Sequence, residues 1–208
     1  MRGLSLTLAL VWASPAWAQV APVIDNARVT VRDISLSPGA PPMTQTYDHD
    51  YVTLFLTGGT TRTNGAVVMH RAGDAVFHPA GTALDAAVSG HPRLVVVELK
   101  DTHTPPLINK TSYPLAFPRP AAKNVLENNK VRVWDYTWRQ GKPTPMHYHD
   151  KDIVVIYLGE GTLDSVTPDG KHTPTLHHPG EIRFNKGDRS HYEVLTQGSQ
   201  SAILMELK

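Results

Sequence analysis

The 208-residue sequence contains two copies of one pattern. Residues 26–39 (NARVTVRDISLSPG) match residues 128–141 (NNKVRVWDYTWRQG) at an offset of 102, and the closing segments 95–100 and 203–208 match at an offset of 108. The drift in offset indicates that the second copy has longer loops but the same order of elements. Because such a repeat forms one structural unit with its own strands, the sequence predicts two homologous modules in tandem.

Both copies have the residue pattern of β-structure. Five segments are rich in β-branched and aromatic residues and are separated by glycine and proline turns: 51–56, 93–99, 131–138, 152–158 and 181–185. No segment shows a sustained apolar period of 3.6 residues, although 121–129 has room for a short helical turn. Many short strands with frequent turns predict an all-β sandwich or barrel for each copy.

Residues 1–18 have the pattern of a secretory signal peptide. A basic start precedes an apolar stretch, and the small-x-small sequence Ala16-Trp17-Ala18 fits a cleavage site. The apolar stretch is too short to span a bilayer. We therefore expect a periplasmic or secreted protein with no membrane anchor after cleavage. The chain has no cysteine, so no disulfide would hold its fold in an oxidising compartment.

The repeat divides the rest of the chain into three parts. We expect an N-terminal repeat over 19–101, a proline-rich connector over 102–122 and a C-terminal repeat over 123–208. Charge is balanced, with 20 Lys and Arg against 19 Asp and Glu, and no basic run occurs. Nucleic acid is therefore not an expected partner, and a small molecule is.

Two segments of the second copy contain the candidate metal-binding histidines. One runs from Gly141 to His147-Tyr-His149, and the other runs from Gly180 to His191. Because residues two apart on a strand share a face, His147 and His149 can present both imidazoles to one centre. His191 from a neighbouring strand would complete a three-histidine metal site with positions open to water or substrate.

These spacings resemble the two motifs of the cupin superfamily, G(x)5HxH(x)3-4E(x)6G and G(x)5PxG(x)2H(x)3N. The resemblance extends over both repeats and implies a bicupin of two tandem cupin-type β-barrels (jelly roll, or double-stranded β-helix). The second motif departs from the family, with Lys186, Asp188 and Leu195 at its proline, glycine and asparagine places. Cupins that resemble this pattern include the three-histidine thiol dioxygenases, so the expected cofactor is a divalent metal, with Fe(II) favoured and Zn, Mn, Ni or Cu as alternatives.

The carboxylate ligand of the family is the main departure in the first motif. Counted forward from His149, it falls on Ile153 or Val154, which are apolar. Counted back from Gly159, it falls on Asp152. Regular strand alternation would turn Asp152 away from the histidines, whereas a bulge or a tighter loop would let it coordinate. Both geometries remain open at this point.

The first copy lacks the metal motif. The alignment places Gln45, Tyr47 and Leu84 opposite the three histidines of the second copy. His49, His70 and His78 do not have ligand spacing, so we expect them to be structural or surface residues. The first copy is therefore expected to serve as a packing partner.

The surroundings of the site are predicted from strand alternation. An apolar wall is expected from Ile153, Val155 and Tyr157, and a rim from Tyr136, Trp138, Arg183 and Tyr192. We expect His177 and His178 to be loop histidines near the mouth, and His172 to be exposed. Arg183 would either suit a small carboxylate substrate or face solvent as an ordinary strand residue.

Two functional hypotheses follow. The first is an oxygenase-like metalloenzyme that acts on a small organic substrate, with the catalytic residues unknown. The second is a non-catalytic protein that binds a metal or small ligand. The fold alone does not separate them, because one scaffold supports many activities.

Overall fold

The computed structural model describes residues 20–35, 43–63, 66–87, 93–100, 102, 105 and 107–208. The predicted signal peptide lies outside the described residues. Seventeen strands are found in the described part of the chain. Within that part, no helix is long and apolar enough to cross a membrane.

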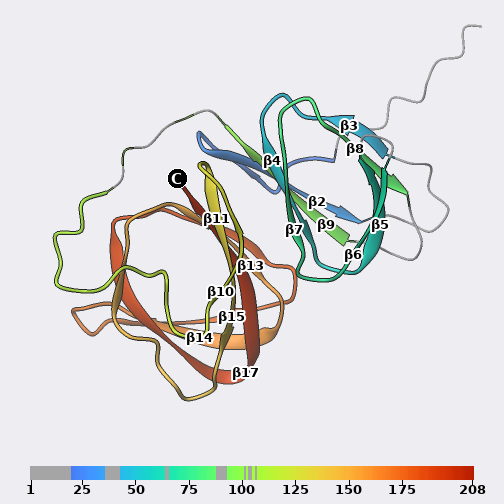
Figure 1. The fold of residues 1–208 in the computed structure, drawn as a ribbon. Helices are drawn as coiled ribbons and strands as arrows, with labels where there is room; N and C mark the ends of the chain where they lie inside the picture. Colours follow the sequence, from blue (N-terminus) through green and yellow to red (C-terminus); the bar gives the residue numbers. More distant parts are fainter. Residues whose placement is uncertain are drawn as a thin grey trace, which may run out of the picture.

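The first lobe consists of two sheets (Figure 1). A five-stranded sheet has the order β1-β2-β9-β4-β7, and a four-stranded sheet has the order β3-β8-β5-β6. The strands are β1 (Ile24–Asp25), β2 (Val29–Ser35), β3 (Met43–Thr46), β4 (Tyr51–Phe55), β5 (Gly59–Thr63), β6 (Ala66–His70), β7 (Ala75–His78), β8 (Ala83–Ala87) and β9 (Arg93–Leu99).

The second lobe is organised around β17, which runs through two sets of pairings. Its first part pairs with β12 and β14, and its last part pairs with β11 and β13. The strands are β10 (Lys123–Glu127), β11 (Val131–Trp138), β12 (His147–His149), β13 (Ile153–Tyr157), β14 (Glu160–Val166), β15 (His172–His177), β16 (Ile182–Asn185) and β17 (Arg189–Leu207). The prediction of two all-β barrels is confirmed. The short helical turn for which 121–129 had room does not form, because Lys123–Glu127 pairs antiparallel with β11.

Strand alternation gives each lobe an inner face and an outer face. The inner face of the first lobe includes Tyr51 and Phe55, and that of the second includes Trp138 and Ile153. The outer faces meet, and fourteen buried residues from both lobes form one cluster: Val29, Val31, Val52, Leu54, Val95, Val97, Leu99, Val131, Val133, Val154, Ile156, Ile203, Met205 and Leu207. The five-stranded sheet of the first lobe thus packs against the strands β10, β11, β17, β13 and β16 of the second lobe, which holds the lobes side by side (Figure 1).

The described part of the connector packs on the second lobe. Ala116 donates its backbone N–H to Tyr148 O, and Tyr148 donates its own to Pro114 O, at 2.8 Å each. Ala116 and Phe117 are buried in the interior of that lobe. The connector therefore brings the residues that follow, including Arg119, to the inside of the second barrel.

Candidate metal centre

The pairing of β12 with β17 brings the three predicted ligands together. His147 lies directly opposite His191 in this antiparallel pair, and His149 shares the inner face with His147. The Nε2 atom of His149 lies 3.1 Å from that of His147 and 3.0 Å from that of His191. All three side chains are buried, and their ligand atoms lie within 4.8 Å of one another.

The arrangement of the three histidines suits a bound metal ion better than it suits hydrogen bonds among the three rings. Pro145 O can only accept, so the Nδ1 of His147, 2.8 Å away, must carry the proton and leave its Nε2 with a lone pair. Ser165 Oγ holds the Nδ1 of His191 at 2.7 Å. Ring nitrogens that converge in this way could hold a shared cation, and partners on Nδ1 are the usual support of metal-binding histidines.

Burial keeps these imidazoles uncharged. It is the main cause that lowers the pKa of His147 to about 4 and the pKa of His191 to about 4. Burial also holds the pKa of His149 well below its ordinary value. The neutral form is the one that coordinates metals, so the three residues are ready to bind an ion at neutral pH.

The nitrogen separations around His149 can be compared with those of metal sites. Two nitrogens about 2.1 Å from a shared ion are about 3.0 Å apart when the ligand angle is near 90°, and about 3.4 Å apart at a tetrahedral angle. The separations from His149 Nε2, 3.0 and 3.1 Å, are compatible with the smaller angle. A facial set of this kind leaves other positions open, as in non-haem iron sites.

A cavity of about 250 Å³ adjoins the histidines. His149 and His191 line it, and so do five of the predicted surrounding residues: Ile153, Val155, Tyr157, Trp138 and Arg183. Tyr136 and Tyr192, which were predicted at the rim, are not among its lining residues. Tyr136 instead packs edge-on against Trp138, with ring centroids 5.0 Å apart.

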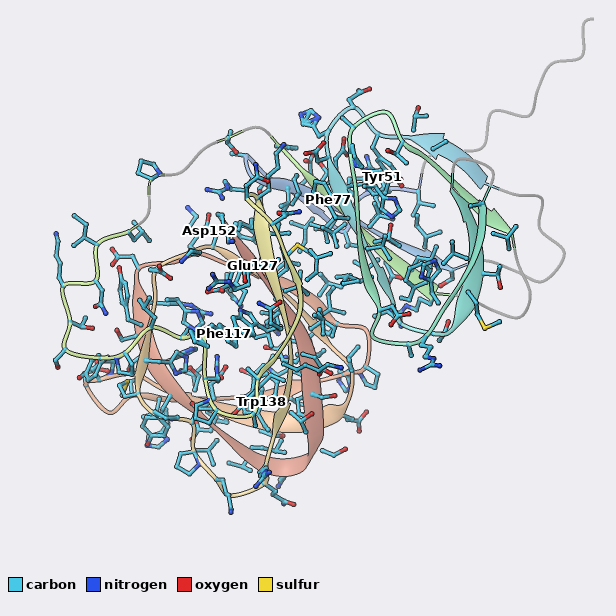
Figure 2. All side chains as sticks on the ribbon, in the orientation of Figure 1. Tyr51, Phe77, Phe117, Glu127, Trp138 and Asp152 are labelled. Atoms are coloured by element: carbon cyan, nitrogen blue, oxygen red, sulfur yellow. The ribbon has the colours of Figure 1, made fainter. Side chains whose placement is uncertain are left out.

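Asp152 lies apart from the histidine cluster. Its Oδ1 accepts the backbone N–H of Gly187 at 2.9 Å. In the first lobe, Asp50 accepts the backbone N–H of Ala80 at 2.7 Å in the equivalent place. In Figure 2, Asp152 lies near the top of the second lobe, and the cavity-lining Trp138 lies in its lower half. The carboxylate therefore anchors a turn that both repeats share, and the glutamate place of the motif falls to Ile153, which lines the cavity.

Several charged residues of the cavity do not follow from the motif. Glu193 accepts hydrogen bonds from Trp138 Nε1 at 3.2 Å and from Arg119 at 3.4 Å. Burial favours a higher pKa for Glu193, but electrostatic interactions with its neighbours, His191 and Arg119 foremost, lower the pKa to about 2. Arg189, opposite His149 in the strand pair, also lines the cavity. The spacing of two from His191 would have placed Arg189 and Glu193 on the inner face, whereas nothing in the sequence pattern points to Arg119.

The remaining histidines of the second lobe have other partners. His177 is buried at the end of β15, so the expected loop position is wrong. It stacks on Tyr157 at 3.8 Å between ring centroids, and its Nδ1 lies 3.2 Å from the Glu181 carboxylate. His172 and His178 are exposed, as expected for His172.

The first lobe repeats the backbone arrangement without the ligands. Gln45 pairs with Leu84 as His147 pairs with His191. His78 stacks on Tyr51 at 4.5 Å between ring centroids, and His70 stacks on Phe55 at 4.0 Å. Over the described ranges, the three histidines of the second lobe form the only cluster suited to a metal.

Comparison with known proteins supports the fold. No model of a known protein family matches the chain. It is 30% identical over 82 residues to the beta-alanine degradation protein BauB of Pseudomonas aeruginosa, a match that covers 39% of this chain and 83% of that protein.

Two solved structures extend the likeness to both lobes. A cupin 2 conserved barrel domain protein from Leptotrichia buccalis aligns with a TM-score of 0.61 and 15% identity, over 90% of this chain and 87% of that one. Bacillus subtilis oxalate decarboxylase, described with Mn(II) centres, aligns with a TM-score of 0.60 and 12% identity, over 86% of this chain and 69% of that one. The chain is therefore a relative of BauB and has the fold of the cupin barrel proteins, with one β-barrel in each of its two lobes.

Proposed function

We propose that this bicupin is an extracytoplasmic metalloenzyme that transforms a small organic molecule in its second barrel. In this proposal, His147, His149 and His191 hold one divalent ion. The observation that carries the proposal is the convergence of three buried imidazoles beside a cavity of about 250 Å³. A shared cation would explain why three buried ring nitrogens converge on one point, which apolar packing alone does not explain.

The ligand set favours Fe(II), and Mn, Zn, Ni or Cu are the alternatives to test. Three neutral imidazoles leave the full charge of the ion to be met by solvent, by an anionic substrate or by the nearby carboxylate of Glu193. When bound, such an ion supplies Lewis acidity and, in the case of iron, redox chemistry with dioxygen. Oxygenation is therefore the reaction that we propose first.

The chain's own residues prepare the cavity for chemistry on a small molecule. Ile153 and Val155 supply apolar wall that limits the access of water. Burial raises the pKa of Tyr157, so its phenol stays protonated and can donate a hydrogen bond. Glu193 is ionised and can accept one. The cavity thus offers both a donor and an acceptor beside the histidines.

The proposed location rests on the signal-like pattern of residues 1–18. Expression of the full chain in a Gram-negative host should yield protein in the periplasm or the medium. Its N-terminus, read by mass spectrometry, should begin at Gln19. Full-length protein retained in the cytoplasm would contradict this part of the proposal.

Metal analysis of the purified protein tests the site. We expect one divalent ion per chain in the wild type and almost none after His147→Ala or His191→Ala. His172→Ala, which removes an exposed histidine, is the matched control and should leave the metal content unchanged. Retention of stoichiometric metal by His191→Ala, or two ions per chain in the wild type, would contradict the assignment.

Turnover separates the enzyme from a binding protein. Dioxygen consumption by the Fe(II)-loaded protein should rise when the right member of a panel of small thiols and carboxylates is added. His191→Ala should abolish that increase. A compound that binds without being consumed would instead support a non-catalytic metal or ligand-binding protein.

A further inference from the structure

Three arginines line the cavity beside the histidines, but they differ in their partners. Arg119 forms an ion pair with Glu193, at 3.4 Å between nitrogen and oxygen. Arg183 forms an ion pair with Glu181 at the surface. The charge of each of these two arginines is therefore met within the protein.

Arg189 has no such partner. Its side chain makes no hydrogen bond and no ion pair with the described residues, and its Nε is buried. The residue begins β17, lies opposite His149 and shares a face with His191 two positions later. Glu193 attracts the guanidinium of Arg189 electrostatically, but it forms its ion pair with Arg119. The half-buried guanidinium of Arg189 therefore lacks a direct partner, and an anion in the cavity would supply one.

The rest of the cavity limits what that anion is. Its volume of about 250 Å³ is below the roughly 300–1,000 Å³ of drug-sized ligand sites, so it suits a small metabolite. Leu163 and Leu204 add to the apolar wall of Ile153 and Val155. A flat carboxylate matches the fork of a guanidinium, and a short carbon skeleton would contact the wall.

We propose that the substrate is a small carboxylate, with its carboxylate bound by Arg189 and its carbon skeleton directed along the apolar wall toward the histidines. This substrate class rests on the proposed function, because it assigns the ligand of the same cavity. Arg189 thus determines specificity, and Arg183 does not.

Butyrate, with butyramide and butylamine as neutral and cationic analogues, provides the probe. Calorimetry or a thermal-shift titration on metal-free and Mn(II)-loaded protein should detect butyrate binding, with butyramide and butylamine much weaker. Arg189→Gln should weaken butyrate binding about 10- to 100-fold, as expected for the loss of a charge-assisted pair. Arg183→Gln, the matched control, should change it less than about 3-fold. Arg189→Lys keeps the charge but not the forked shape of the guanidinium. Its affinity for butyrate should lie between those of the wild type and Arg189→Gln.

The outcomes separate this proposal from the proposed function. If Mn(II) binds but butyramide matches butyrate on the wild-type protein, the carboxylate assignment is overturned without reference to any variant. Equal butyrate affinity in folded Arg189→Gln, as judged by circular dichroism, overturns it as well. If the wild type binds butyrate through Arg189 but binds no metal, the carboxylate site stands and the metalloenzyme fails. Phosphate binding equal to that of butyrate would show a general anion site and would also overturn the assignment.

Discussion

At the scale of single residues, comparing Asp152 with its counterpart in the first repeat distinguishes a metal ligand from a carboxylate that supports the backbone. Asp50 holds the same backbone position in the first lobe, where the sequence carries no metal motif. We expect Asp152→Asn to keep the hydrogen bond to Gly187 and to change metal affinity less than about 3-fold. Calorimetric titration of both proteins with Mn(II) checks this, and a loss of about 10-fold or more would assign the carboxylate to the metal.

Ile153 occupies the glutamate place of the motif and is fully buried at the cavity wall. A carboxylate introduced there has no partner until a cation arrives, so Ile153→Glu should destabilise the metal-free protein. Metal should then raise its melting temperature by more than it raises that of the wild type. Ile153→Gln, equal in size and uncharged, is the control for differential scanning calorimetry. An equal metal-induced shift in Ile153→Glu and Ile153→Gln would place the side chain out of reach of the ion.

His78 makes the first lobe sensitive to acid. Burial, followed by the charge of His70, lowers its pKa from 6.5 to about 4. Above pH 6.5 the histidine is neutral in both the folded and the unfolded state. As the pH falls from 6.5 to 4, the unfolded state takes up the proton first, which costs about 3 kcal/mol of stability.

His78→Phe preserves the ring stacked on Tyr51 but removes this titration. Urea unfolding should therefore show the stability of the wild type falling relative to the variant between pH 6.5 and pH 4. His172→Gln, a change at an exposed histidine, is the control. A constant difference between wild type and variant across this range would be inconsistent with a buried neutral His78.

The sequence predicts those site residues that a short local pattern marks. His147 and His149 follow from a spacing of two, and His191 follows from the second motif. Arg119 enters the cavity from the connector, through pairing between Pro114, Ala116 and Tyr148. Such a contact depends on how distant segments pack, and no periodicity in the sequence encodes it.

At the scale of elements, the strands of the shared sheet could be predicted because they are apolar and β-branched. Segment 131–138 is β11 as expected, and 93–99 is β9. The β14–β15 hairpin has a weaker signal, because its outer face is exposed and polar. The length of β17 was not predictable either, since its polar middle from Thr196 to Ser201 resembles a loop in composition.

Gly198 marks the bend within β17. Its φ is +76°, and a Cβ atom there would lie 2.3 Å from Glu160 O. Gly198→Ala should therefore lose stability both from the left-handed backbone and from the clash, by about 3 kcal/mol or more. Gly170→Ala is the matched control, because its φ is +80° and its Cβ would meet nothing within 4 Å. Its cost should be about 1–2 kcal/mol by urea unfolding, and equal costs for the two variants would exclude the clash.

At the scale of the whole molecule, the shared cluster explains why a lobe without the metal motif is retained. Its apolar residues come from both lobes, including Val97 of the first and Met205 of the second. Separation of the lobes would expose both faces, at a cost of about 1.5–3 kcal/mol for each large side chain. The summed cost exceeds the net free energy of unfolding of a small barrel. We therefore expect the division proposed at 102–122 to separate the repeats in the sequence without making either lobe fold on its own. Lys130 and Asp50 add an ion pair across the same junction, at 2.9 Å.

This coupling predicts that metal bound in the second lobe protects the first. A ligand that binds only the folded state raises the free energy of every opening that destroys its site. If the lobes unfold together, Mn(II) should slow hydrogen exchange at the amides of Val95 and Val97 in β9 as much as at Leu204 in β17. His191→Ala should abolish both effects, and amides of the exposed turn at 167–171 should exchange at the same rate throughout. Protection that rises in β17 alone would mean that the two barrels open independently, in spite of the core they share.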